Sequence, residues 1–500
     1  MNVPALSESE TTTITPDVSQ RKWSFVAAGL LALIYFVTSI LIARHRLFWY
    51  DEIYTVVLSR LPDLGSIWRV LAHGGDSMPP TYYMLVRAFE RLPIPFEVSA
   101  RLPSALAMVI GMLITFDCAR RLTDGLHGLI ALAVLSCSIL PYYGYEARPY
   151  TLYFMFASMA LWLRLHASDT GKLSALLFGI VIFLGVAVHY YVVLCLVPYA
   201  AWEAWNWRRR RAPSSRLVAG LVAVLCAGAL FSTQILSIHR VLSPASWSPA
   251  TVASLAAIYD DFFPYALFPL IGIMILVGLA GPGKKDAAID TMQPSEQLCW
   301  FFAFIPLAGY VLAKIGANAF YNRYFIGLLP GIAVAFSCLL WRQLKSSRWI
   351  SVGALILFAV LGLGRQLDLV RHPAHVRPLA RKTEPDRMNE VLSLQDKIPA
   401  TQSIVIPSGE ILSLEAHYYA KHPERYVFLL GPHESRPDLW ALGSSGENRP
   451  IRHWTVEELI AHAREATLIN PSQDTIDTLE HAGHKTSGHY DGVLDVVNVE

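Results

Sequence analysis

The chain has 500 residues, of which 54% are hydrophobic and 16% are charged, and its formal net charge is +2. Soluble domains carry nearer a quarter of charged residues, so this composition favours a membrane protein. The small net charge argues against a nucleic-acid-binding protein, which relies on a large basic surface. The six cysteines lie in or beside apolar stretches without paired spacing. We interpret them as buried small residues, not as disulfides or metal ligands.

The chain begins with a polar segment, residues 1–22, which we expect to be a disordered cytoplasmic tail. Apolar stretches follow, and a helix needs about 20 such residues to cross the hydrocarbon core of a bilayer. They predict an all-α polytopic membrane domain over residues 23–365, with about eleven transmembrane helices. Their expected limits are Trp23–Ala43, Ser99–Ala119, Leu126–Tyr142, Tyr150–His166, Leu173–Val188, Tyr190–Trp205, Leu217–Ile238, Pro264–Gly281, Leu298–Lys314, Phe325–Trp341 and Trp349–Gly364.

The basic residues predict the orientation of these spans. One set of short loops is rich in Lys and Arg, including the run Arg208–Arg211, whereas the short loops on the other side hold few. The positive-inside rule places the basic set in the cytoplasm. The long first loop, residues 44–98, and the segment 366–500 then lie on the external side. We expect interfacial helices in that loop at Leu64–Leu71 and Tyr82–Leu92.

The segment 366–500 is ordinary in polarity and alternates helical with strand-like patterns. Strands are predicted at Ser403–Ile406, Tyr426–Leu430 and Val493–Val499, and a helix at Val456–Ala466. We therefore predict a small external soluble α/β domain at the C-terminal end.

Five polar clusters interrupt the apolar stretches, and the predicted topology places all of them on the external side. They are Trp49–Glu52, His73–Asp76 with Pro79–Tyr83, Tyr145–Tyr150, His189–Tyr191 and Tyr321–Tyr324. This convergence on one side predicts a shared site.

The acidic pair Asp51 and Glu52 follows the first span directly. A carboxylate there can accept a proton from an acceptor hydroxyl, or hold a divalent cation that shields a phosphate. The alternative is a solvated acidic pair at the start of an interfacial helix. His73 and Asp76 flank two glycines, which indicates a loop whose backbone can approach a ligand. Two such residues fall short of a metal site, and a surface loop histidine is the alternative.

Two arginines lie at expected membrane edges, Arg148 near Glu146 and Arg323 between tyrosines. An arginine there is costly unless it is paired or bound to an anion, and its planar fork suits phosphate. The alternatives are an ion pair with Glu146 or an ion pair between spans for Arg148, and a snorkelling side chain in an aromatic belt for Arg323. His189 beside Tyr190 is open to either a substrate-binding or an interfacial role. Aromatic rings at this depth can face a sugar or a prenyl chain.

The order of these motifs resembles the family 39/83-type glycosyltransferases of the GT-C fold. The motifs are Asp51-Glu52, Asp76 with Pro79–Tyr83, Glu146–Tyr150 and Asn322–Tyr324. That group includes protein mannosyltransferases, the aminoarabinose transferase of lipid A and rhizobial lipopolysaccharide galacturonosyltransferases. The resemblance covers residues 23–341. It implies a transferase of the bacterial inner membrane and cell envelope that takes a sugar from a polyprenyl-phosphate donor, with inversion, and passes it to a lipid, polysaccharide or protein acceptor.

The resemblance also implies roles for individual residues. Asp51 would be the base or metal-shielding acid, Glu52 would support it, and Glu146 would be a second acid. Arg148 and Arg323 would meet the carrier phosphate. The other candidate substrate-binding residues are His73, Asp76, Tyr82, Tyr83, Tyr150, His189, Tyr190 and Tyr324. Met78 stands where relatives often carry a histidine, which argues against metal binding through this motif. A divalent metal ion stays an open alternative. The functional alternative is a transporter or flippase for a lipid-linked sugar, which would be expected to carry internal repeats or mid-membrane ionisable residues.

Overall fold

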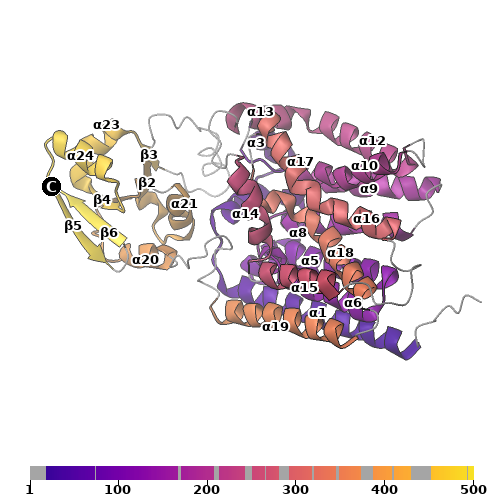
Figure 1. The fold of residues 1–500 in the computed structure, drawn as a ribbon. Helices are drawn as coiled ribbons and strands as arrows, with labels where there is room; N and C mark the ends of the chain where they lie inside the picture. The colour runs from indigo at the N-terminus through magenta and orange to yellow at the C-terminus, as the bar shows by residue number, and fades with distance from the viewer. Residues whose placement is uncertain are drawn as a thin grey trace, which may run out of the picture.

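A computed structural model describes residues 18–73, 75–166, 171–207, 213–242, 250–264, 266–280, 292–317, 320–344, 348–372, 387–407, 410–429, 452–491 and 494–500. Most of the expected cytoplasmic tail and the basic run Arg208–Arg211 lie outside these residues. Figure 1 shows a bundle of helices with a smaller unit of strands and helices at one end of it.

The described part of the bundle runs from α1 to α19. Its α-helices are α1 (Val18–His45), α2 (Tyr50–Ser59), α3 (Leu64–Ala72), α4 (Thr81–Phe89), α5 (Phe96–Leu122), α6 (Gly125–Ser136), α7 (Leu140–Tyr143), α8 (Tyr150–His166), α9 (Lys172–Val188), α10 (Leu196–Trp205), α12 (Ser215–Leu230), α13 (Ser232–Leu242), α14 (Val252–Phe262), α15 (Leu267–Ala280), α16 (Pro294–Phe301), α17 (Ile305–Leu312), α18 (Leu329–Gln343) and α19 (Arg348–Arg371). Short helical turns of other pitch are η1 (Tyr190–Cys195), η2 (Phe302–Phe304), η3 (Ala313–Ala317) and η4 (Asn322–Leu328).

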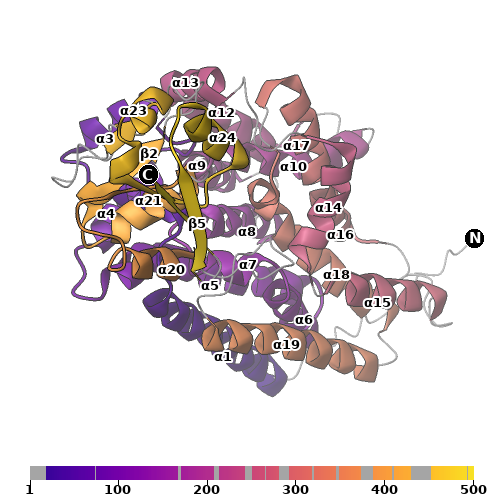
Figure 2. The same cartoon turned by 90° about the vertical axis from the view of Figure 1, so that its left-hand side faces the viewer.

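The position of each helix in the bundle follows from how its apolar residues are distributed. Helix α6 is apolar on all sides, and its residues from Ile130 to Ser136 are all buried, as expected of a helix enclosed by others. Helices α1 and α19 lie side by side at the edge of the bundle (Figure 2) and expose large apolar side chains. Where α19 meets α6, a Cβ on Gly362 would lie 2.3 Å from the hydroxyl oxygen of Ser136. Glycine therefore permits this close approach.

The structure supports a multi-pass membrane protein but does not confirm eleven spans. Among the described residues, five helices are long and apolar enough to cross a membrane, and up to seven if each bent helix pair is one span. The five are Lys22–His45, Phe96–Leu122, Pro294–Ile315, Asn322–Gln343 and Arg348–Arg371. The last helix continues beyond Gly364, where we expected the final span to end. Helices α6 and α9 are apolar but shorter.

The span expected at Leu217–Ile238 is wrong as a single helix. Helices α12 and α13 meet at Phe231 and are bent by 69° at that point. The polar sequence Ser232-Thr233-Gln234 follows the bend. Gln234 is buried, and its amide nitrogen donates to the backbone carbonyl of Met78 at 2.7 Å. The bend therefore directs a polar side chain toward the first loop.

The two amphipathic stretches of the first loop form helices α3 and α4, at the positions that the sequence predicts. Beyond the bundle, a six-stranded sheet has the order β3-β2-β1-β4-β6-β5. Strands β1 to β4 pair in parallel, and β6 pairs antiparallel to both β4 and β5. The strands are β1 (Ser403–Val405), β2 (Tyr426–Leu429), β3 (Arg452–Trp454), β4 (Ala466–Ile469), β5 (Thr486–Asp491) and β6 (Leu494–Val499).

Helices accompany this sheet, and its described core forms two apolar clusters. One cluster joins the sheet to α20 (Arg387–Leu394) and α21 (Glu410–Tyr419), and the other joins it to α23 (Val456–Ala461) and α24 (Gln473–His481). The described part of this unit also contains the short turns η6 (Pro423–Arg425) and η7 (Ala463–Glu465). The strands expected near residues 403, 426 and 493 are present. The expected helix Val456–Ala466 ends at Ala461, and β4 begins at Ala466.

Candidate active site

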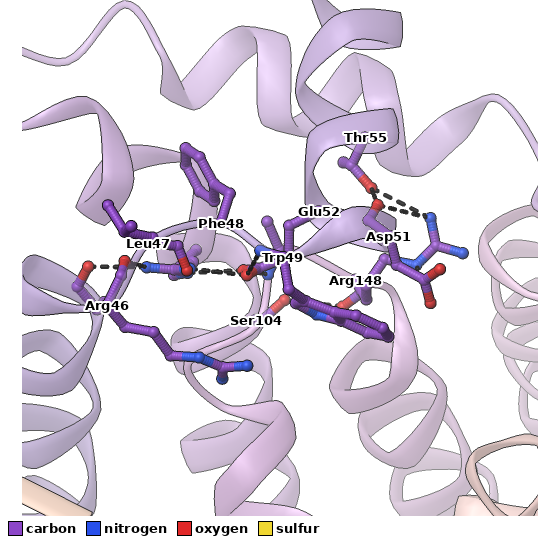
Figure 3. Close-up of polar contacts among 12 residues, drawn as sticks. Arg46, Leu47, Phe48, Trp49, Asp51, Glu52, Thr55, Ser104 and Arg148 are labelled. Carbon is purple, nitrogen blue, oxygen red and sulfur yellow. Dashed lines mark hydrogen bonds and ion pairs between the residues drawn. The ribbon is translucent and has the colours of Figure 1, made fainter. Parts of the chain in front are cut away.

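A buried ion pair anchors the segment that joins α1 to α2. Arg101 in α5 donates from Nε and Nη2 to the two carboxylate oxygens of Glu52, at 2.6 and 2.7 Å. Burial would raise the pKa of Glu52, but the charge of Arg101 holds it below its usual value. The other Arg101 hydrogen bonds go to the carbonyls of Ala43, Arg46 and Leu47. Glu52 also accepts from the N–H of Ala147 at 2.7 Å. The pair thus ties the joining segment to α5 and to the loop before α8 (Figure 3).

Asp51 lies one residue earlier, where α2 begins, and faces two arginines. Its Oδ2 is 2.8 Å from Nη1 of Arg323 and 3.9 Å from Nε of Arg148. The Nη1 of Arg148 also donates to the backbone carbonyl of Asp51 at 3.2 Å, which Figure 3 shows. The Asp51 side chain keeps 15% exposure, whereas that of Arg148 keeps 4%. The Asp51 carboxylate is therefore still partly exposed to a ligand, and the side chains of Arg148 and Arg323 hold it in place.

Asp76 binds the same arginine from the other side. Its Oδ2 accepts from Nη1 of Arg148 at 2.8 Å and from the hydroxyl of Tyr83 at 2.7 Å. Burial would raise the pKa of Asp76, but the charge and hydrogen bond of Arg148 lower it. Arg148 therefore links Asp76 to Asp51, although 25 positions separate the two acids in the sequence.

Glu146 is a buried acid of a different kind. Among the described residues, neither of its carboxyl oxygens has a hydrogen-bond partner. Burial, assisted by the charge of nearby Glu52, raises the pKa of Glu146 to about 7. The opposing charges of Arg46 and Arg323 only partly offset this effect. Glu146 therefore holds its proton to a higher pH than an ordinary glutamate, which suits a group that exchanges a proton.

His189 lies among aromatic side chains beside the arginines. Its ring lies 5.3 Å from that of Tyr153, 5.6 Å from that of Tyr150 and 5.8 Å from that of Tyr324. The N–H of Tyr191 donates to its Nδ1 at 3.2 Å, so the neutral ring carries its proton on Nε2. Burial first, and then the charges of Arg148 and Arg323, lower the pKa of His189 to about 3. The imidazole is therefore a neutral donor, not a cation.

Comparisons with known proteins bear on the fold that carries these residues. The model of the dolichyl-phosphate-mannose-protein mannosyltransferase family matches residues 77–235. Among solved structures, ArnT from Cupriavidus metallidurans in the apo state has a TM-score of 0.59 and 14% identity, covering 96% of this chain and 98% of that one. The same ArnT bound to undecaprenyl phosphate has a TM-score of 0.55 with the same identity and coverage. No curated protein matches the chain in sequence.

The chain has the GT-C glycosyltransferase fold of the protein mannosyltransferase and ArnT type. This confirms the resemblance drawn from the motifs. The ArnT match spans nearly the whole chain, including the C-terminal sheet, whereas the motif resemblance ended at residue 341.

Not all of the predicted site residues meet in this GT-C bundle. His73 is exposed at the end of α3, and its Nδ1 contacts the carbonyl of Arg69 at 2.7 Å. The hydroxyl of Tyr82 pairs with that of Ser104 at 2.8 Å, which in turn donates to the carbonyl of Arg148. Tyr82 is fully buried, and through Ser104 it supports the backbone at Arg148. His73 and Tyr82 thus make these contacts away from Asp51, and a substrate-binding role for either stays a prediction.

Tyr190 and Tyr83 reach the site indirectly. The Tyr190 hydroxyl donates to Gln234 at 2.6 Å, and Gln234 holds the carbonyl of Met78. Tyr83 reaches the site through its hydrogen bond to Asp76. The structure brings together the remaining predicted residues: Asp51, Glu52, Asp76, Glu146, Arg148, Tyr150, His189, Arg323 and Tyr324.

Sequence reasoning missed Arg101 and Gln234. Arg101 falls three residues inside an expected apolar span and Gln234 lies near the end of another. A charged or amide side chain at such a depth needs an internal partner, and that signal could have marked both residues.

The acids of this GT-C site do not form a metal-ligating set. Among the described residues, no group of three or more His, Cys, Asp or Glu side chains could hold a metal ion. Asp51 and Asp76 each face an arginine at 2.8 Å, and Glu52 is occupied by Arg101. The arginines supply the positive charge beside the acids.

Proposed function

We propose that the protein transfers a sugar from a polyprenyl-phosphate donor to an acceptor hydroxyl at the external face of the membrane, with inversion. The observation that carries this proposal is the partly exposed carboxylate of Asp51 facing the buried arginines 148 and 323. A carboxylate beside two cations suits a reaction in which one group takes a proton while an anionic phosphate departs.

The proposed reaction is a single displacement at the anomeric carbon. Asp51 accepts the proton of the acceptor hydroxyl as its oxygen attacks that carbon. The bond from the anomeric carbon to the phosphate oxygen breaks, and the electron pair leaves with the polyprenyl phosphate. Attack from the face opposite the leaving group inverts the anomeric configuration. A guanidinium has five N–H donors, so Arg323 can hold Asp51 along one edge and a phosphate along another.

Several buried hydrogen-bond donors near Arg323 support a phosphate subsite. The described structure gives no hydrogen-bond partner to the hydroxyls of Tyr143 and Tyr150, to Nε2 of His189 or to Nε1 of Trp49. The guanidinium carbon of Arg323 lies 5.4 Å from the ring centre of Tyr150 and 5.8 Å from that of Trp49. Each unsatisfied buried donor costs about 1–3 kcal/mol, so an anion that accepts from several of them would bind favourably.

Glu52 has a supporting role in this proposal. Both of its carboxylate oxygens accept hydrogen bonds, from the Arg101 side chain and from the backbone N–H groups of Ala147 and Trp49. A carboxylate so fully bonded and buried is poorly placed to accept a proton from an acceptor. We assign Glu52 to holding Asp51 in place, which agrees with the role that the resemblance implied. No observation on the described residues favours the alternative of a lipid flippase.

The first test compares the wild type with Asp51→Asn, both purified in detergent, on a panel of radiolabelled polyprenyl-phosphate sugars. The measured quantity is release of the sugar from the lipid, to water or to a membrane extract. We expect the wild type to consume one donor and Asp51→Asn to lose about 10²-fold or more in kcat.

Asp396→Asn is the matched control. Asp396 forms an exposed ion pair with Lys421 at 2.9 Å and contacts none of the site residues in the described structure. This variant should keep wild-type turnover. Equal turnover by all three proteins would remove Asp51 from the centre of the reaction. Consumption of no donor, together with flipping of the same lipids in liposomes, would replace the transferase proposal by the transporter.

A further inference from the structure

Two hydrogen bonds connect the C-terminal unit to the segment that carries Asp51. The backbone N–H of Phe48 donates to the hydroxyl oxygen of Tyr419 at 2.6 Å. The backbone N–H of Tyr50 donates to a carboxylate oxygen of Glu415 at 2.7 Å. Glu415 and Tyr419 both belong to α21, which lies against the sheet and contacts α2. Residues more than 360 positions apart therefore meet immediately beside the proposed base.

The N–H groups involved are those that the segment cannot satisfy by itself. Tyr50 is the first residue of α2, and the N–H groups of the first helical turn have no partner within their own helix. A carboxylate at this position accepts the hydrogen bond and also interacts favourably with the positive end of the helix. Glu415 supplies it from α21, and its side chain is 4% exposed. Asp51 is the next residue in the chain.

Aromatic and apolar contacts from α5 and from the C-terminal unit also hold this segment. The ring of Phe48 meets that of Tyr418 edge-on at 6.4 Å and that of Phe96 at 5.5 Å. The guanidinium carbon of Arg101 lies 4.6 Å from the centre of the Phe48 ring. Leu47, next to Phe48, packs on the apolar cluster of the C-terminal unit. Helix α5 thus fixes one side of the segment, and α21 fixes the other.

We infer that Glu415 and Tyr419 are positioning residues, through which the C-terminal unit holds the backbone of residues 48–51 and sets the place of the Asp51 carboxylate. This inference rests on the proposed function for its effect on turnover. Displacing a catalytic group by about 1 Å can cost on the order of 10²-fold in rate. A link made by two hydrogen bonds beside Asp51 is therefore expected to affect kcat more than binding of the lipid donor.

The test uses the full chain in detergent, with Tyr419→Phe and Glu415→Ala as variants. Each removes one acceptor and leaves the apolar packing of α21 largely intact. Hydrogen–deuterium exchange of peptides covering residues 46–55 reports the two N–H groups directly. We expect the exchange at Phe48 or Tyr50 to become at least about 10-fold faster, and kcat to fall about 10-fold with KM for the donor changed less than about two-fold.

Glu415→Gln and Lys421→Ala serve as controls. Glutamine keeps an acceptor oxygen for Tyr50, so Glu415→Gln should restore slow exchange and most of kcat. Lys421 follows α21 and its side chain is exposed, so Lys421→Ala should match the wild type in both measurements. Recovery with glutamine separates positioning from a general loss of folding.

Unchanged exchange in both Tyr419→Phe and Glu415→Ala would overturn the inference, as would faster exchange with unchanged kcat. If the wild type consumed no donor at all, the proposed function would fail by itself. The exchange rates would still decide whether α21 fixes the segment, because they do not depend on turnover.

Discussion

At the scale of single residues, the site is a set of buried charges whose roles differ by their partners. Arg101 directs hydrogen bonds to Glu52 and to three backbone carbonyls, so it is fully committed to structure. Arg148 binds two acids and keeps its orientation through them. Neither carboxyl oxygen of Glu146 has a hydrogen-bond partner within the described residues. A buried charge without a partner is costly, so Glu146 is where ionisation should be coupled to stability.

Glu146 predicts a pH dependence of stability. The pKa of Glu146 rises from its ordinary 4.5 to about 7, chiefly through burial. Between these values the folded protein binds more protons than the unfolded chain, so the contribution of this group to stability is lost as the pH rises. Glu146→Gln cannot ionise. Its melting temperature minus that of the wild type should therefore increase from pH 4.5 to pH 7 and stay constant above. A difference that is independent of pH would contradict the assignment.

At the scale of elements, the bend between α12 and α13 links the middle of the bundle to the first loop. The bend brings Gln234 to the carbonyl of Met78 and to the hydroxyl of Tyr190. Met78 lies two residues after Asp76, so this contact also restrains the segment that binds Arg148. A polar side chain near the end of an expected span is thus part of the support of the site.

Gln234→Leu should destabilise the protein by about 1–3 kcal/mol, because it leaves the Met78 carbonyl and the Tyr190 hydroxyl without their partner. The measurement is reversible unfolding in detergent or, where unfolding is irreversible, the shift in melting temperature. The double variant Gln234→Leu with Tyr190→Phe should lose less than the sum of the two single variants, since they share one contact. Strict additivity would show that the two side chains act independently.

At the scale of the whole molecule, the C-terminal unit lies at one end of the helix bundle (Figure 1). Its contact with the segment before α2 places it beside Asp51. Helix α19 extends to Arg371, so the external domain expected from residue 366 onward begins later in the chain. We propose that the unit from α20 to β6 forms this external domain, and that site and domain face the same side of the membrane. The distribution of Lys and Arg in the loops supports the external side.

Fusions at the C-terminal end test this orientation. Alkaline phosphatase, which is active only outside the cytoplasm, should be active when fused after Glu500. A green fluorescent protein that matures only inside should stay dark at the same position. The opposite pair of results would invert the predicted topology and move the proposed reaction to the cytoplasmic face.

The sequence by itself determined the class of the protein and most of the chemical groups of its site. Long apolar stretches favour placement in the membrane. Within the hydrocarbon core, a helix satisfies the backbone N–H and C=O groups of such a stretch, because no water is available to bond them. Acids and arginines in short loops beside such helices are costly unless they act together, so their grouping could be expected. The clusters around Asp51, Glu146, Arg148 and Arg323 were found on this basis.

Only the tertiary structure decided how those groups pair and which residues support them. Adjacent residues Asp51 and Glu52 begin one helix and point to different partners, one toward a reachable cluster and the other into a buried ion pair. The partner of Glu52 is 49 positions away, and Glu415 and Tyr419 reach the same segment from more than 360 positions away. Local patterns carry no information on such contacts, since they arise from the packing of whole helices. The bend at Phe231, after which Gln234 bonds the Met78 carbonyl, is likewise a feature of the tertiary structure.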